Sequence, residues 1–166
     1  MASILKVDTI KKVDDSIPTV ADLGINATGS VLQVVQNTSN ALVNTSSNNF
    51  LNSGFSVGIT PTSSTSKILL TLNVFLTIVN GGQAALNIYS SADSAFVTSL
   101  SNGFGGIYNA GGSSFESIQS INFLTDVVGS TTSRTYSLYG KSTGTDPAYF
   151  LNGTRLSTFT AMEIAG

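Results

Sequence analysis

Cysteine, histidine and tryptophan are all absent from this sequence. Without cysteine the chain can form no disulfide and no thiolate metal site, and the redox state of its compartment stays open. The lack of histidine and cysteine also removes the residues that most often act as general base or nucleophile in hydrolases. A pair of carboxylates is therefore the one catalytic arrangement that remains.

Charged residues are scarce as well. They make up 10% of the 166 residues, against about 25% in an ordinary soluble domain. The net charge of −2 provides no basic surface for phosphate groups, so we expect no nucleic-acid binding. Hydrophobic residues reach 41%, and the chain must stay soluble largely through serine, threonine, asparagine and glycine.

Long apolar runs are missing too. The most apolar stretch, residues 68–79, has twelve residues, whereas a helix that crosses a membrane needs roughly 20. We therefore expect no membrane span. The first ten residues contain Lys6 and Asp8 and lack the apolar core of a secretory signal, so we expect synthesis in a cytoplasm.

The charges that are present gather at the N-terminus. Seven of the sixteen charged residues fall within the first 22, and residues 23–66 contain none. The opening segment mixes both signs of charge with Pro18 and shows no sustained helical or strand period. We expect residues 1–29 to form an extended N-terminal arm and residues 30–166 to form one folded domain.

The second region has the pattern of an all-β protein. Its clearest segment, KILLTLNVFLTIV at 67–79, alternates apolar and polar residues with the period of a half-buried strand. Asn80-Gly81-Gly82 predicts a hairpin turn after it. The other runs that predict strands are 31–36, 50–60, 84–89, 95–100, 115–126, 135–139 and 156–164. This spacing is typical of an antiparallel, jelly-roll-like sandwich.

Several segments, taken in order, are similar to those of a known group of proteins. The segments MASILKVDTI, IPTVADLG, GSVLQVVQ, SSTSKILLTLNV and STFTAMEIAG resemble short tail-fibre and related virion structural proteins of tailed bacteriophages, notably those infecting cyanobacteria and marine bacteria. The resemblance implies a location in the virion and a C1q- or TNF-like jelly roll that forms a trimer around a three-fold axis. The shaft repeats of a long fibre are absent, which favours a compact knob, a short fibre or a capsid decoration.

The low charge also bears on partners. Interfaces between identical subunits are depleted in charged residues, so we expect a homotrimer in preference to a monomeric sandwich coated with serine and threonine. Within the arm, a few apolar side chains next to charges of both signs could anchor the protein to other virion proteins of the tail or capsid. The residues predicted to make this attachment are Ile4, Leu5, Lys6, Val7 and Ile10.

Aromatic residues suggest a second kind of contact. Tyr108 lies in a glycine-rich segment with Asn102 and Asn109, and we take these three as candidates for binding a host surface glycan. A carbohydrate-binding module is accordingly the alternative function. The other aromatic residues of the later strands are expected in the core or at a subunit interface, and they are Phe104, Phe115, Tyr136, Tyr139, Tyr149 and Phe150.

Catalysis and metal binding find little support. Glu116 and Asp126 fall at opposite ends of one predicted strand, roughly 33 Å apart, whereas the two acids of a glycosidase lie about 5–10 Å apart. The pair Asp14-Asp15 lacks the further oxygen ligands that Ca²⁺ requires, so we interpret it as solvated or facing a partner. We expect no enzymatic activity, no cofactor and no metal.

Overall fold

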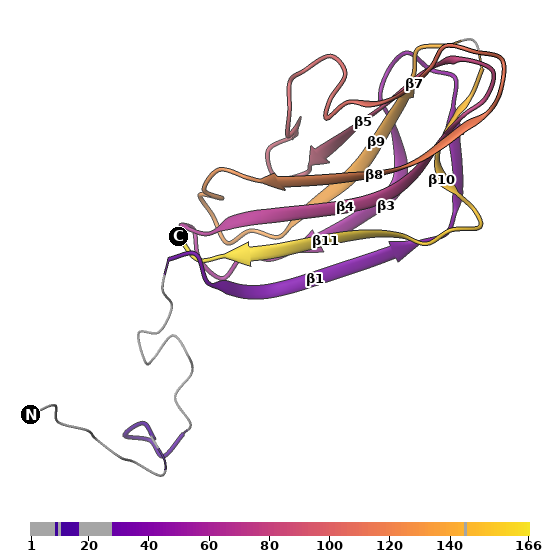
Figure 1. Cartoon of the computed structure of the whole chain (residues 1–166). Coiled ribbons are helices and arrows are strands. Elements are labelled where there is room, and N and C mark those ends of the chain that lie inside the picture. Colours follow the sequence, from indigo (N-terminus) through magenta and orange to yellow (C-terminus); the bar gives the residue numbers. More distant parts are fainter. Residues whose placement is uncertain (1–8, 10, 17–27, 145) are drawn as a thin grey trace, which may run out of the picture.

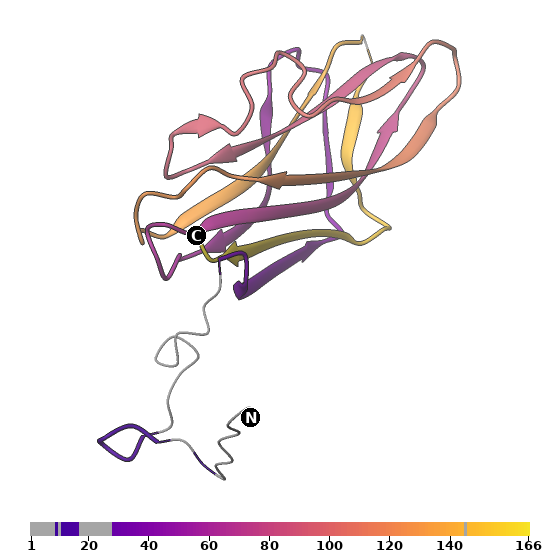
Figure 2. The same ribbon diagram turned by 60° about the vertical axis from the view of Figure 1, so that its left-hand side comes forward.

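The computed structural model describes residues 9, 11–16, 28–144 and 146–166. In this part of the chain the fold is all-β, with eleven strands and no helix. The strands form two antiparallel sheets that pack face to face (Figures 1 and 2). The predicted all-β antiparallel sandwich is thus confirmed. No helix among the described residues is long and apolar enough to span a bilayer.

The first sheet, sheet A, is built around the longest strand. Its main strands, in spatial order, are β1 (Val31–Ser39), β11 (Ser157–Ile164), β4 (Lys67–Ile78) and β8 (Phe115–Leu124). A short pair extends the same layer, namely β10 (Ala148–Asn152), which pairs with the end of β4, and β2 (Leu42–Thr45).

The second sheet, sheet B, contains the remaining strands. In spatial order they are β3 (Leu51–Ile59), β9 (Arg134–Ser142), β5 (Gly82–Ser90) and β7 (Gly106–Asn109), and β6 (Ala95–Phe96) also pairs with β5. The long strands pair in a nested order. The first, β1, pairs with the last, β11, and the next, β3, pairs with β9. This nesting is the strand order of a jelly roll.

The alternation in β4 explains how the sandwich is filled. Its even-numbered side chains, from Ile68 to Ile78, are buried as predicted, and its odd-numbered side chains face the other way. Phe55, Val57 and Ile59 of β3 are buried from the opposite sheet, again as predicted. Burying such side chains contributes about 1.5–3 kcal/mol each, so this two-sheet core supplies most of the driving force for folding.

A turn follows β4 as predicted, but it is not a hairpin, because β4 belongs to sheet A and β5 to sheet B. Asn80, Gly81 and Gly82 have φ values of 57°, 102° and 113°, the left-handed region that glycine and asparagine tolerate best. Gly140 on β9 is required for a different reason, because the Phe150 ring packs directly against it. A Cβ at position 140 would lie 2.5 Å from Phe150 Cδ1.

Three strands were not predicted. The strands β2 and β10 are short, with four and five residues, and pair with one another at the end of sheet A. The third, β7, lies in the segment that the sequence predicted as a glycine-rich loop, and it pairs with the start of β5. Conversely, the predicted strand at 95–100 is wrong beyond Phe96, where β6 ends, and residues 97–105 turn back over sheet B.

The arm enters the domain beside the C-terminus. Gly29 N donates to Ala165 O at 2.8 Å, and Ala165 N donates to Ser30 O at 2.8 Å, which continues the ladder between β1 and β11. The chain therefore begins and ends its folded part at the same end of the sandwich (Figure 1).

Candidate functional site

The five residues predicted to attach the protein to a virion, Ile4, Leu5, Lys6, Val7 and Ile10, lie outside the described residues. The described part of the arm, residues 11–16, forms a turn in which Lys12 N donates to Ser16 O at 2.9 Å.

The acidic pair of the arm takes part in this turn. Asp14 accepts hydrogen bonds from Ser16 Oγ at 2.6 Å and Ser16 N at 3.1 Å, and these bonds lower the pKa of Asp14. Asp15 Oδ1 lies 3.4 Å from Lys11 Nζ. Both carboxylates therefore make local contacts within the turn.

The predicted glycan contacts lie on β7 and the turn before it. Tyr108 is 71% exposed and pairs with Gln83, next to the start of β5. The side chain of Asn109 is held by the following loop, since its Nδ2 donates to Ser113 O and its Oδ1 accepts from Gly111 N.

Asn102 lies apart from these two residues. It belongs to the turn packed against Leu86, which is roughly 10 Å along β5 from the position of Tyr108. The structure thus brings Tyr108 and Asn109 together. It places Asn102 further toward the end of the sandwich where Gly29 meets Ala165.

Tyr108 stands at the end of the sandwich opposite the termini. The turn between β4 and β5 and the loop after β9 meet beside it, because Thr143 N donates to Gln83 O at 2.9 Å. A Cβ on Gly82 would lie 2.9 Å from Gly144 Cα, so this contact depends on glycine on both sides. The domain consequently has an arm end and a free end.

The outer face of sheet B carries an aromatic cluster that the sequence did not predict. Phe96 lies 5.3 Å from Phe50, 5.6 Å from Tyr89 and 5.2 Å from Tyr139, measured between ring centroids. Lys141 Nζ lies 5.0 Å above the Phe50 ring, within the range of a cation–π interaction. Tyr136 and Phe150, by contrast, are buried in the core as expected.

A shallow hollow of about 490 Å³ lies next to this cluster. Asn87 on its floor is 1% exposed and donates from Nδ2 to Thr98 O at 3.0 Å, which ties the covering loop to the sheet. Apolar rings beside hydroxyl and amide groups suit a small amphipathic ligand. The lining residues are Phe50, Asn87, Ala95, Phe96, Thr98, Ser99, Leu100 and Ser101.

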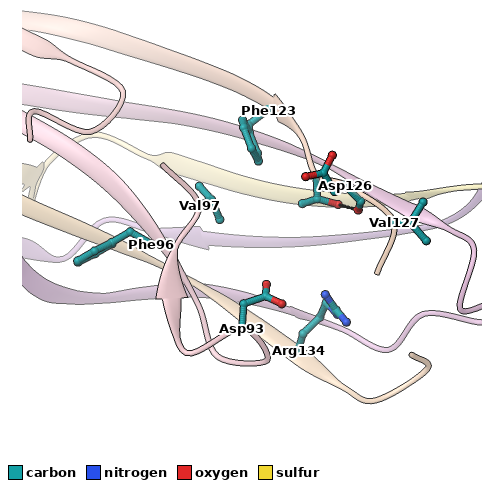
Figure 3. Close-up of a pocket in the computed structure, with 8 residues that line it drawn as sticks. Asp93, Phe96, Val97, Phe123, Asp126, Val127 and Arg134 are labelled. Carbon is teal, nitrogen blue, oxygen red and sulfur yellow. Dashed lines mark hydrogen bonds between the residues drawn. The ribbon is translucent and has the colours of Figure 1, made fainter. Parts of the chain in front are cut away.

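A second hollow opens along the edge of the sandwich, between the end of β8 and the turn from β5 to β6. Its volume is about 260 Å³, and Figure 3 shows Asp93 and Arg134 from sheet B facing Phe123 and Asp126 from sheet A. Phe104 and Phe123 close this edge, with ring centroids 5.4 Å apart.

Arg134 is the most unusual residue of this edge cleft. It is 4% exposed, and its Nη2 donates to Val128 O at 2.9 Å, yet its Nε has no hydrogen-bond partner. The neighbouring Tyr136 Oη is also buried without a partner. Burial raises the pKa of Tyr136, and the guanidinium of Arg134 opposes this rise.

The cleft also brings together two carboxylates, Asp93 and Asp126, that the sequence gave no reason to combine. Both are exposed, and Asp93 Oδ2 accepts from Ser90 Oγ at 2.5 Å. Glu116, the residue first compared with Asp126, lies toward the other end of β8.

Glu163 is the one fully buried acid in the described chain. Its carboxylate accepts from Gln33 Nε2 at 2.6 Å, Thr62 N at 2.7 Å and Ser63 N at 3.2 Å. Burial alone would raise the pKa of Glu163, but these hydrogen bonds outweigh it and hold the pKa below the ordinary value. The residue joins β11, β1 and the loop before β4 at the arm end.

Among the described residues, no group of three or more acidic side chains is placed to hold a metal ion. In comparison with known proteins, no family model matches the chain, and no curated protein is significantly similar to it.

Proposed function

We propose that this chain is a non-enzymatic structural protein of a tailed-phage virion, a trimeric surface appendage of the short tail-fibre or capsid-decorating kind. The N-terminal arm attaches it to the tail or capsid. The observation that carries the proposal is the division of the domain into an arm end and a free end. The order of the resembling sequence segments supports the same interpretation.

At the arm end several segments are hydrogen-bonded to β11. Gly29 is hydrogen-bonded to Ala165, and Glu163, two residues before Ala165, accepts from Thr62 N in the loop before β4. A partner that binds the arm is therefore connected to strands β1 and β11 through these hydrogen bonds. The free end, with exposed Tyr108, then faces away from the particle.

The experiment that tests this function is localisation of the chain in purified particles. Immunogold labelling with antibodies against residues 30–166 is expected to mark tails or capsids at regular positions, and mass spectrometry of the same particles is expected to detect the chain. Particles that infect normally and contain none of it would contradict the proposal.

The alternative function is a carbohydrate-binding module, which the aromatic hollow of sheet B favours. Ring faces can pack on the C–H faces of a sugar while the serine and threonine hydroxyls of the loop exchange hydrogen bonds with its hydroxyl groups. A glycan array with the intact chain, Phe96→Ala and Tyr108→Ala tests it. Binding that is lost only in Phe96→Ala assigns recognition to the hollow, and loss only in Tyr108→Ala assigns it to the free end. An array without binding counts against this alternative.

A further inference from the structure

Among the described residues, no other strand or loop packs over the outer face of sheet A. Its strands β1, β11, β4 and β8 run side by side (Figures 1 and 2). On β4 the outward residues are the odd-numbered ones, such as Leu69 and Thr71, and all of them except Thr77 are partly exposed. The strand register decides which neighbours lie beside each of them.

Two apolar rows cross this face at right angles to the strands. Nearer the arm end, Leu69 lies beside Met162 and Leu124, and Met162 lies beside Val34. Val34 is 57% exposed and Leu124 is 49% exposed. Nearer the free end, Phe75 lies beside Ile118, which is 59% exposed.

Two uncharged polar rows lie between the apolar rows. One contains Thr71, whose Oγ1 donates to Asn122 Oδ1 at 3.0 Å. The other contains Asn73, whose Nδ2 donates to Thr158 Oγ1 at 3.4 Å. These side chains carry both donors and acceptors, so each can also form hydrogen bonds with an identical group.

Charged residues occur only at the two ends of this face. Lys67 precedes the first apolar row. At the other end Arg155 Nη1 pairs with Glu116 Oε2 at 3.0 Å, and the Arg155 guanidinium lies 4.5 Å from the centroid of the Phe75 ring, so it covers part of the second apolar row. The outward positions between them, on all four strands, carry no charge. Identical copies that meet around a symmetry axis bring like side chains together, so an interface near the axis must avoid charge.

The direction of the rows indicates the symmetry. A rotation about an axis parallel to the strands keeps every row at its own height. Apolar rows of neighbouring copies then meet each other, and the polar rows meet each other. The same rotation sends every arm out at one end, because the arm joins the domain beside Ala165.

The flat area of the face is about two-thirds of what one stable interface buries on each partner. Four strands spaced about 4.8 Å apart, over about nine residues, give a flat footprint of roughly 550 Å² before side-chain relief is added. A stable interface buries about 800 Å² on each partner.

We propose that the outer face of sheet A is the surface on which copies of this chain meet, around an axis parallel to its strands. The inference rests on the proposed trimer and adds the location and direction of its contact.

The test places charge on this face with almost no change of volume. In the double variant Asn73→Asp with Asn122→Asp, each copy brings two negative charges to the polar rows. Asn52→Asp is the matched control, because Asn52 is exposed on sheet B and its Oδ1 already accepts from Gly54 N. Light scattering after gel filtration gives the mass of each protein, and circular dichroism reports the β-structure.

We expect the wild type and the control at three times the chain mass of 17.1 kDa, and the double variant at 17.1 kDa with an unchanged β-signal. High salt should restore the double variant's trimer, because it screens the repulsion. A double variant that stays trimeric at low salt overturns the sheet A contact and leaves the trimer standing. A wild type of two copies overturns the proposed axis, and a monomeric wild type overturns the trimer itself.

Discussion

Gln33 Nε2 and Glu163 Oε2 lie 2.6 Å apart and join the first strand of the domain to the last. Glu163 also accepts from the backbone of Thr62 and Ser63, so one buried carboxylate connects three segments that are distant in sequence. A carboxylate with several donors is a strong acceptor, because charge-assisted hydrogen bonds are about twice as strong as neutral ones.

Glu163→Gln should therefore lower the free energy of unfolding by about 1–3 kcal/mol, since an amide accepts more weakly and brings its own N–H groups to a site full of donors. Urea titration followed by circular dichroism measures the change. Glu116→Gln is the matched control, because it removes a partly exposed ion pair that contributes less than about 1 kcal/mol. Equal losses of unfolding free energy in the two variants would show that the hydrogen bonds of Glu163 do not contribute more than the exposed ion pair.

The same residue predicts a dependence on pH. The folded-state pKa of Glu163 lies below its ordinary value of 4.5, so its stabilising contribution is fully present above the unfolded-state pKa. The contribution is lost as the pH falls through the folded-state pKa, where the carboxylate becomes protonated. Urea titrations between pH 7 and pH 3 should show that the difference in unfolding free energy between wild type and Glu163→Gln becomes smaller as the pH falls. A gap that widens toward low pH would contradict this sign.

Gly140→Ala should destabilise the domain by about 1–3 kcal/mol, because the new Cβ meets the buried Phe150 ring. Gly58→Ala on β3 is the control, since the nearest atom to its Cβ is Thr135 Oγ1 at 3.9 Å. Thermal melts of both variants give the comparison. If Gly140→Ala has the same melting temperature as the wild type, the Phe150 ring does not pack directly against Gly140.

Removal of residues 1–28 should leave the domain folded, because the first core strand begins at Val31. The β-signal in circular dichroism should be retained, and the shortened protein should still trimerise while particles assembled with it lack the protein. An unfolded product would mean that the arm belongs to the core. Particles that carry the shortened protein at normal copy number would place the attachment surface in the domain.

The sequence predicted those parts of the fold that a strand's own pattern determines. The alternation of β4 and the position of the Asn80-Gly81-Gly82 turn are local signals, and both are confirmed. That this turn passes from one sheet to the other, and is not a hairpin, depends on the packing of the two sheets. Strands β7 and β10 are too short for their own pattern to mark them, and their pairing depends on the neighbouring strands. The limits of β6 could not be predicted for the same reason.

The surface features were harder to predict than the core. Asp93, Asp126 and Arg134 lie on separate segments, and only the packing of two sheets brings them to one cleft. Phe96 meets Phe50 and Tyr139 on sheet B because β6 and the start of β3 flank the pair formed by β5 and β9. The low charge of the sheet A face was visible in composition, but its rows required the strand register.

Sedimentation equilibrium of the full chain at micromolar concentration tests the central claim most directly, because a trimeric appendage must first be a trimer. We predict a single species with three times the chain mass of 17.1 kDa, which persists at physiological salt. A single species of 17.1 kDa under these conditions would contradict the account.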